Sequence, residues 1–299
     1  MKLFRVTALV ATALVAVACE RAKAPAPTDS ARLSGPLAVD SAIAASKASQ
    51  RWDPSLGPVL LTMADAPTRA FVLVPDSAST AATIAAIPHP AAVTLIGRGG
   101  TVQTAELPAL AEGGVCLSSV LSAAPPPRPW SVGFIGGVVA PVALDSTESL
   151  SRADSATIVV ASTRLASALP NDTAGRFSGL PFVVRAIWRF TIPSGPEIVV
   201  SMLTRQINQE ATPLQERTFL ISERQTSDSV PVTAYSERSY GEEETIESRE
   251  LLAALLLGGN RDAAIILARD YGDATAYSIV QRGSDKQWTL RWSSPRRRC

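Results

Sequence analysis

Histidine is almost absent from this chain. The one histidine, His89, stands between Pro88 and Pro90. A Ser-His-Asp or Cys-His mechanism would have to use that residue, and no serine lies within a G-x-S-x-G motif. A single histidine also excludes H-E-x-x-H motifs and most zinc sites. We therefore expect His89 to be a surface-loop residue, with a catalytic base as the alternative.

Other motifs that carry chemistry are missing as well. The chain has no P-loop, no G-x-G-x-x-G segment, no S-x-x-K and no C-x-x-C. These absences remove the usual signatures of nucleotide binding, of zinc sites and of penicillin-binding or β-lactamase chemistry. The sequence accordingly predicts no catalytic residue, no metal ligand and no cofactor.

Charge is sparse and nearly balanced. Charged residues make up 18% of the chain, and the formal net charge is +1. Nucleic-acid-binding proteins usually have a basic face, whereas the basic run here is Arg296-Arg297-Arg298, which we interpret as a solvated tail. The acidic run Glu242-Glu243-Glu244, with Glu247, could help to hold Ca²⁺, although a solvated hairpin end is the preferred interpretation. We expect no nucleic-acid partner.

No apolar segment is long enough to cross a bilayer. The uninterrupted run Val6–Ala18 is well short of the roughly 20 residues that a spanning helix requires. Gly133–Leu144 is broken by glycines and by Pro141. Because Lys2 and Arg5 precede the first run and small residues end it, the layout of residues 1–18 is that of a signal peptide.

Cys19 follows this leader directly, and Ala16-Val17-Ala18-Cys19 resembles the lipobox of bacterial lipoproteins. The resemblance covers the leader and no folded domain. It implies that the Cys19 sulfur takes a diacylglycerol and that Cys19 becomes the first residue of a membrane-anchored chain. Ala16 stands where this class prefers leucine, and an ordinary secretory signal with an A-x-A site would be cut at the same bond. Glu20, in place of the aspartate that retains such proteins in the inner membrane, implies the outer membrane.

The segment after Cys19 has the composition of a spacer. Glu20–Pro36 holds proline, alanine, serine and scattered charge, with almost nothing that could be buried. Such a stretch cannot offset its ordering entropy. We therefore assign residues 19–50 to a flexible tether.

Cysteine is scarce, with three residues in the chain. If Cys19 carries lipid, Cys116 and Cys299 remain as an even pair in an oxidising compartment. We expect a disulfide between them. It would close a very long loop, for which chain entropy gives on the order of 5 kcal/mol. The alternative is two unpaired thiols.

Hydrophobic periodicity predicts a mainly β fold with one or two helices. Residues 51–144 contain short strands, among them a hairpin of Ala91–Ile96 and Thr101–Leu107 around a glycine-rich turn. Residues 145–179 are assigned to a helix and connector. The main helix is expected over 145–169, with Asp145 and Glu148 as a capping pair and Pro170 as its end.

Residues 180–299 alternate with period two, which is typical of antiparallel sheet. On residues 182–192 this alternation assigns Phe182, Val184, Ala186, Trp188, Phe190 and Ile192 to one face, and Arg185, Arg189 and Thr191 to the other. A hairpin turn is expected at Tyr240-Gly241. The pattern leaves a barrel, a sandwich and propeller-like blades open.

The predicted location and the missing signatures together favour a non-catalytic envelope lipoprotein. It would be held to a membrane through Cys19 and would bind or support an envelope protein or polymer. The alternative is a carboxylate-dependent hydrolase acting on glycan or cell-wall polymer, with some of the five tryptophans lining its groove. Two acids facing each other in such a groove would favour the enzyme, and a purely structural role stays open.

Overall fold

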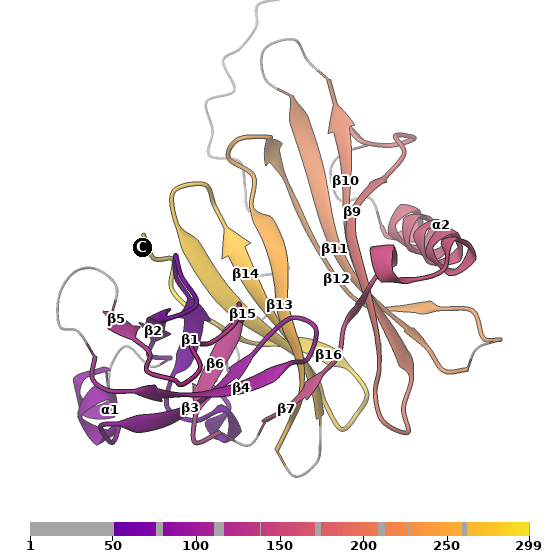
Figure 1. Cartoon of the computed structure of the whole chain (residues 1–299). Helices are drawn as coiled ribbons and strands as arrows, with labels where there is room; N and C mark the ends of the chain where they lie inside the picture. The colour runs from indigo at the N-terminus through magenta and orange to yellow at the C-terminus, as the bar shows by residue number, and fades with distance from the viewer. Residues whose placement is uncertain are drawn as a thin grey trace, which may run out of the picture. The chain divides into compact units, whose positions relative to one another are not determined.

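The computed structural model describes residues 51–75, 80–110, 117–137, 139–170, 175–208, 213–226, 228–258 and 262–298. These residues form antiparallel sheets with two α-helices (Figure 1). The predicted mainly β fold class is confirmed. Cys19, Cys116, Cys299 and the tether 19–50 lie outside the described residues.

The first sheet, called sheet A, is built from the N-terminal part of the described chain. Its strands lie in the order β4 (Val102–Leu107), β3 (Ala91–Ile96), β6 (Val132–Ile135), β1 (Leu60–Met63), β2 (Arg69–Leu73) and β5 (Leu117–Val120). The predicted hairpin is confirmed, because β3 and β4 pair from Ala91 opposite Leu107 to Ile96 opposite Val102. Ile84 on the short helix α1 (Thr80–Ala86) packs into the apolar cluster on one face of this sheet.

Sheet B is the middle layer. Its strands lie in the order β16 (Trp288–Ser293), β15 (Thr275–Arg282), β14 (Asp262–Asp270), β13 (Ser248–Leu257) and β7 (Val139–Val142). One face packs on sheet A through contacts such as Leu255 with Phe134, and the other packs on sheet C. Burial on both faces explains why Leu251–Leu257 is continuously apolar instead of alternating.

Sheet C holds the strands β12 (Val232–Glu242), β11 (Leu214–Arg224), β10 (Glu197–Ile207), β9 (Val183–Thr191) and β8 (Asp145–Ser146), in that order. Sheets B and C are connected at one edge, where β7 leads into β8, and β12 and β16 contact each other at the opposite edge. The strands therefore curl into a half-barrel. An apolar layer between the two sheets includes Phe190, Val200 and Ile221 from sheet C and Ile265 and Val280 from sheet B.

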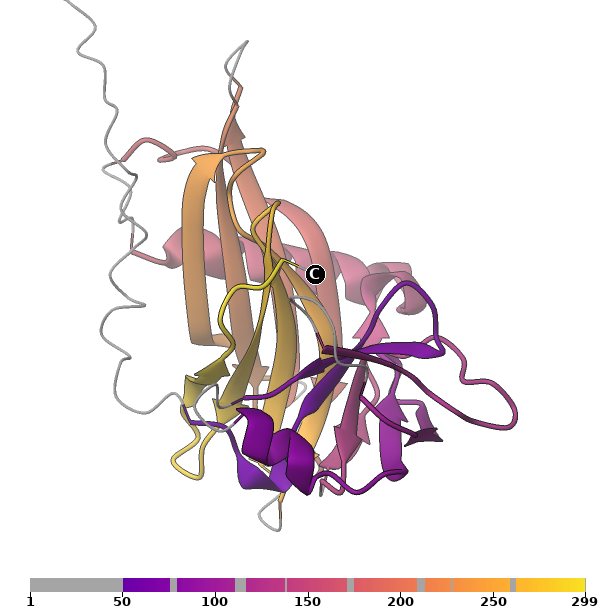
Figure 2. The same cartoon turned by 90° about the vertical axis from the view of Figure 1, so that its left-hand side faces the viewer.

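Helix α2 (Arg152–Ala168) covers the outer face of sheet C, beside β9–β12 (Figures 1 and 2). Its Ile158 packs on Ile187 and Val199, and its Ala166 packs on Leu203 and Leu220. The hydroxyl groups of Ser162 and Ser201 lie 2.8 Å apart in this interface.

The predicted start of the main helix at Asp145 is wrong. Asp145 lies in β8, where it pairs with Arg189 of β9, and a short 3-10 turn, Thr147–Ser149, follows. The cap is Ser151, whose hydroxyl accepts a hydrogen bond from the Asp154 amide at 3.1 Å. Strand pairing with Arg189 thus outcompetes the capping pair that the sequence offered.

The predicted hairpin turn at Tyr240-Gly241 is also wrong. Both residues lie inside β12, opposite Glu216 and Gln215 of β11. The turn falls later, between Glu242 and Ser248, and it contains most of the acidic run. Glycine was a misleading signal here, because within a strand it can also mark a close backbone approach.

The basic run at the C-terminus is held against the fold instead of being a free tail. Thr275 and Arg297 exchange backbone hydrogen bonds in an isolated bridge. The Arg296 guanidinium lies 3.6 Å from the Tyr271 ring centroid, and Arg298 forms an ion pair with Asp273. Its exposed side chains stay solvated while its backbone is paired.

A buried charge cluster ties the end of α2 to sheet C. Glu216 is fully buried, 2.9 Å from Arg205 Nη2 and 3.7 Å from Arg238 Nε. Arg238 also donates hydrogen bonds to the Ala166 and Pro170 carbonyl oxygens at the end of the helix. A cation at this end is favourable because the last carbonyls of a helix are unpaired and carry partial negative charge.

We predict that Glu216→Gln lowers the free energy of unfolding by about 3 kcal/mol, because two buried guanidinium groups then lose the carboxylate they share. Urea denaturation followed by tryptophan fluorescence measures the change. Glu244→Gln, at an exposed position in the turn after β12, is the control and should change stability by less than about 0.5 kcal/mol. Equal stabilities of Glu216→Gln and the parent would contradict this account.

Candidate functional site

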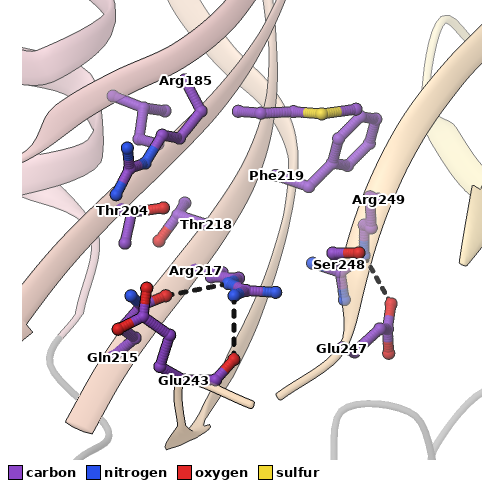
Figure 3. A pocket seen from close by; sticks show the side chains of 12 residues that line it. Arg185, Thr204, Gln215, Arg217, Thr218, Phe219, Glu243, Glu247, Ser248 and Arg249 are labelled. Carbon is purple, nitrogen blue, oxygen red and sulfur yellow. Dashed lines mark hydrogen bonds and ion pairs between the residues drawn. The ribbon is translucent and has the colours of Figure 1, made fainter. Parts of the chain in front are cut away.

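A cavity of about 380 Å³ lies between sheet C and the beginning of β13 (Figure 3). Its wall combines three arginines, two glutamates, several uncharged polar side chains and an apolar patch. The charged members are Arg185, Arg217, Arg249, Glu243 and Glu247. The apolar members are Met202, Leu203 and Phe219, and the others are Thr204, Gln215, Thr218 and Ser248.

Two central strands supply one wall through regular alternation. Met202 stands opposite Phe219, and Thr204 stands opposite Arg217, in the register of β10 and β11. Residues opposite each other in an antiparallel pair share one face. The apolar layer between the sheets therefore continues into the cavity at Met202 and Phe219 and becomes polar two residues further on.

Arg185 reaches the cavity because β9 is irregular at that point. Met202 pairs with Ala186 and Leu203 pairs with Val184, so Arg185 is an extra, unpaired residue, a β-bulge. Bulges turn a side chain away from the direction that strict alternation would give it.

The same bulge divides the apolar residues that alternation placed on one face. Trp188 and Phe190 pack between sheets B and C, with Ala186 and Ile192 at the margin of that cluster. Phe182 and Val184, before the bulge, pack with Ala166 of α2 on the other side of the sheet. The predicted single face of 182–192 is therefore correct only after Arg185.

Four buried charged side chains form a closed ring beside the cavity, which we call the Arg–Glu ring: Arg249, Arg269, Glu237 and Glu247. Arg249 and Arg269 are directly opposite each other on β13 and β14. Glu237 on β12 lies 3.1 Å from Arg249 and 2.7 Å from Arg269. Glu247 lies 2.7 Å from Arg249 and 3.1 Å from Arg269.

The Arg–Glu ring shifts the pKa values of Glu237, Arg269 and Tyr235. Burial alone would raise the pKa of Glu237, but the charges of Arg249 and Arg269 outweigh it and hold the pKa below its ordinary value. Burial opposes the charged form of Arg269, yet Glu237 and Glu247 raise its pKa. Burial and the adjacent Glu237 carboxylate raise the pKa of Tyr235, whose hydroxyl donates to Glu237. At pH 7 Glu237 and Arg269 are therefore charged, and the Tyr235 phenol is neutral.

Arg217 is held in place by three hydrogen bonds. It donates to Gln215 Oε1 at 3.1 Å, to the Ile246 carbonyl at 3.0 Å and to the Glu243 carbonyl at 3.2 Å. Burial lowers the pKa of its guanidinium, and the charges of Arg185 and Arg249 lower it further, against the opposing effect of Glu243 and Asp270. An arginine stays protonated in these conditions, so the cavity wall carries closely spaced positive charge.

A second polar contact joins sheets B and C at the opposite end of their apolar layer. Glu223 of β11 accepts hydrogen bonds from Arg282 Nε and from Trp288 Nε1, both at 2.6 Å. This glutamate is buried, and both of its hydrogen-bond donors come from sheet B. The apolar layer is therefore bounded by a charged contact at each end.

Of the residues that the sequence singled out, Glu243 and Glu247 both line the cavity, and His89 does not. His89 is exposed in the loop between α1 and β3, as predicted. Glu242, Glu243 and Glu244 are exposed, whereas Glu247 is buried in the Arg–Glu ring, so the predicted solvated hairpin end holds for the first three only. Among the residues that the structure describes, no group of three or more histidine, cysteine, aspartate or glutamate side chains is placed to hold a metal ion.

The tryptophans serve as packing residues. Trp188 and Trp288 lie between sheets B and C, and Trp52 meets Trp292 edge to face between sheets A and B, with ring centroids 4.8 Å apart. Trp130 packs into the cluster on the other face of sheet A and donates to the Pro67 carbonyl. None of them lines the cavity.

Sequence reasoning named two cavity residues, Glu243 and Glu247, but it missed the arginines of the cavity and of the Arg–Glu ring, although a signal for three of them is present. Arg217 stands two residues before Phe219, Arg249 two before Leu251, and Arg269 two after Leu267. Each therefore lies on the strand face of a core residue, where an arginine must find a buried partner.

Comparisons with known proteins add no assignment. A scan against protein-family models gives no match, and searches of curated proteins and of solved structures give none either. Within the described ranges, no helix combines the length and the apolar character needed to cross a membrane.

We predict that Glu237→Gln lowers the free energy of unfolding by about 3 kcal/mol at neutral pH, because two buried arginines lose a shared carboxylate. The folded-state pKa of Glu237 lies below its ordinary value of 4.5, so its stabilising contribution is complete above pH 4.5 and is lost as pH falls from there through the lower folded-state pKa. The parent should therefore lose more stability than Glu237→Gln between neutral and acidic pH.

Urea denaturation at a series of pH values tests this prediction. Glu148→Gln, at an exposed position beside Thr147, serves as the control and should follow the parent throughout. Parallel pH dependences for the parent and Glu237→Gln would show that Glu237 is not the titrating group.

Proposed function

We propose that this protein is an exported lipoprotein, held to a membrane through Cys19, with a non-catalytic binding role. Its ligand would enter the cavity between sheet C and β13. The leader supports the location, because a basic start, an apolar run and a cysteine after small residues are the features of that class. The tether 19–50 would separate the folded part from the membrane.

The cavity is the observation that carries the binding role. Its volume of about 380 Å³ falls within the range of about 300–1,000 Å³ that is usual for small-molecule sites. Such sites combine apolar walls with a few placed polar groups. Here Met202 and Phe219 provide the apolar wall, and Arg185 and Arg217 provide the polar groups.

The carboxylates at the cavity favour binding over hydrolysis. Glycoside hydrolysis needs two carboxyl groups flanking the scissile bond, one of them protonated. Glu247 is buried and forms ion pairs with Arg249 and Arg269, and Glu243 is exposed at the rim. With no tryptophan on the wall, the cavity also differs from the glycan groove that the hydrolase hypothesis requires.

We predict that Cys19→Ser moves the protein from the membrane fraction to the soluble fraction, or leaves it with its leader uncut. The serine hydroxyl cannot replace the sulfur that takes the lipid. Fractionation of the native host, with intact mass of the N-terminal peptide, measures both results. Ser30→Ala, in the predicted tether, leaves Cys19 in place and should stay in the membrane. Unchanged membrane attachment of Cys19→Ser would contradict the anchor.

We also predict that the folded part binds the fluorescent probe anilinonaphthalene sulfonate (ANS) with one-to-one stoichiometry, and that Met202→Trp weakens this binding. The larger indole fills space inside the cavity, and a loss of about tenfold in affinity is expected from the displaced contacts. Fluorescence titration gives the affinity, and circular dichroism checks the fold.

Val160→Trp is the matched control, because it adds the same ring on α2 at a residue that is 65% exposed. Its affinity for ANS should equal that of the parent. If the parent does not bind ANS, or if Met202→Trp binds it as well as the parent does, the cavity is not a ligand site.

A further inference from the structure

The charges of the residues that line the cavity do not balance. The Arg–Glu ring is neutral, since two arginines face two glutamates within 3.1 Å. The remaining charged residues on the wall are Arg185, Arg217 and Glu243. They leave one positive charge in excess. The neighbouring arginines on this wall already repel one another.

The two remaining arginines also keep hydrogen-bond donors available. A guanidinium has five N–H donors, and the contacts of Arg217 to Gln215, Ile246 and Glu243 use three of them. Arg185 is exposed and makes no hydrogen bond or ion pair within the described part of the chain. This unpaired cation stands at the bulge in β9 and lines the cavity.

The cavity wall also includes apolar side chains. Met202 is half-buried, and it stands opposite the buried Phe219 in the register of β10 and β11. A fully hydrated inorganic anion would leave the exposed part of Met202 in contact with water, whereas a ligand with an apolar body would cover it. Figure 3 shows Arg185 and Phe219 among the residues that line the cavity, with their side chains extending in different directions.

We propose that the cavity binds a small organic anion with an apolar body. The anionic group, a carboxylate, sulfonate or phosphate, pairs with Arg185 and with the remaining donors of Arg217. The apolar body lies against Met202 and Phe219. This inference rests on the proposed binding role of the same cavity and adds the chemical class of the ligand.

The test compares two probes that share one ring system. ANS carries a sulfonate, whereas N-phenylnaphthylamine (NPN) has the same rings without it. The parent should bind ANS more tightly than NPN. Arg185→Gln should weaken ANS binding by about tenfold, the loss typical of one charge-assisted contact. NPN binding should change less than twofold, and Arg185→Lys, which keeps the charge, should restore most of the ANS affinity.

Arg164→Gln is the charge-matched control. Arg164 is exposed on α2, across sheet C from the cavity, and its replacement removes the same charge from the whole molecule. It should leave both affinities unchanged. Inorganic phosphate, an anion without an apolar body, should fail to displace ANS at concentrations at which decanoate displaces it.

Each contrary result has its own meaning. If Arg185→Gln leaves ANS binding unchanged, or weakens ANS and NPN binding equally, the proposal that the ligand is an anion is wrong. Displacement of ANS by phosphate as readily as by decanoate would show that the ligand needs no apolar body. If neither probe binds the parent, or if Met202→Trp binds both as the parent does, the cavity itself is not the site and the proposed function fails.

Discussion

Arg249 and Arg269 face each other across neighbouring strands, a pairing that would repel in isolation. Glu237 comes from the opposite sheet and Glu247 from the turn before β13, and each bridges both arginines. The charge on sheet B is therefore neutralised only when sheet C lies against it in one position. Breaking such a ring leaves buried charge uncompensated, so it constrains the distance between the sheets at the end where the cavity opens.

Glu223 imposes a similar constraint at the other end through Arg282 and Trp288. Between the two charged contacts the layer is apolar and tolerant of sliding, because hydrophobic burial has no direction. The polar contacts have direction, so they define the register in which the apolar surfaces meet. A cavity beside the Arg–Glu ring can persist because the ring keeps the layers apart without help from core side chains.

The local pattern of apolar and polar residues was sufficient to predict most strands and the body of α2. The alternating and continuous apolar runs predict β10, β13 and β14, and the hairpin of β3 and β4 follows from its glycine-rich turn. The order of the strands within each sheet could not be predicted from the sequence, because β7 pairs with β13 across more than a hundred residues of chain. The Arg–Glu ring could not be predicted either, because Glu237 and Arg269 become partners only when the two sheets stack.

The bulge at Arg185 makes the charge of the cavity depend on the number of residues in β9 as well as on their identity. A chain that lacked one residue between Val184 and Ala186 could keep every core side chain after that point and restore regular pairing with β10. Its arginine would be gone from the cavity all the same. Among chains of this architecture, an alignment gap at this position would therefore distinguish chains with and without the cavity arginine more clearly than substitutions in the core would.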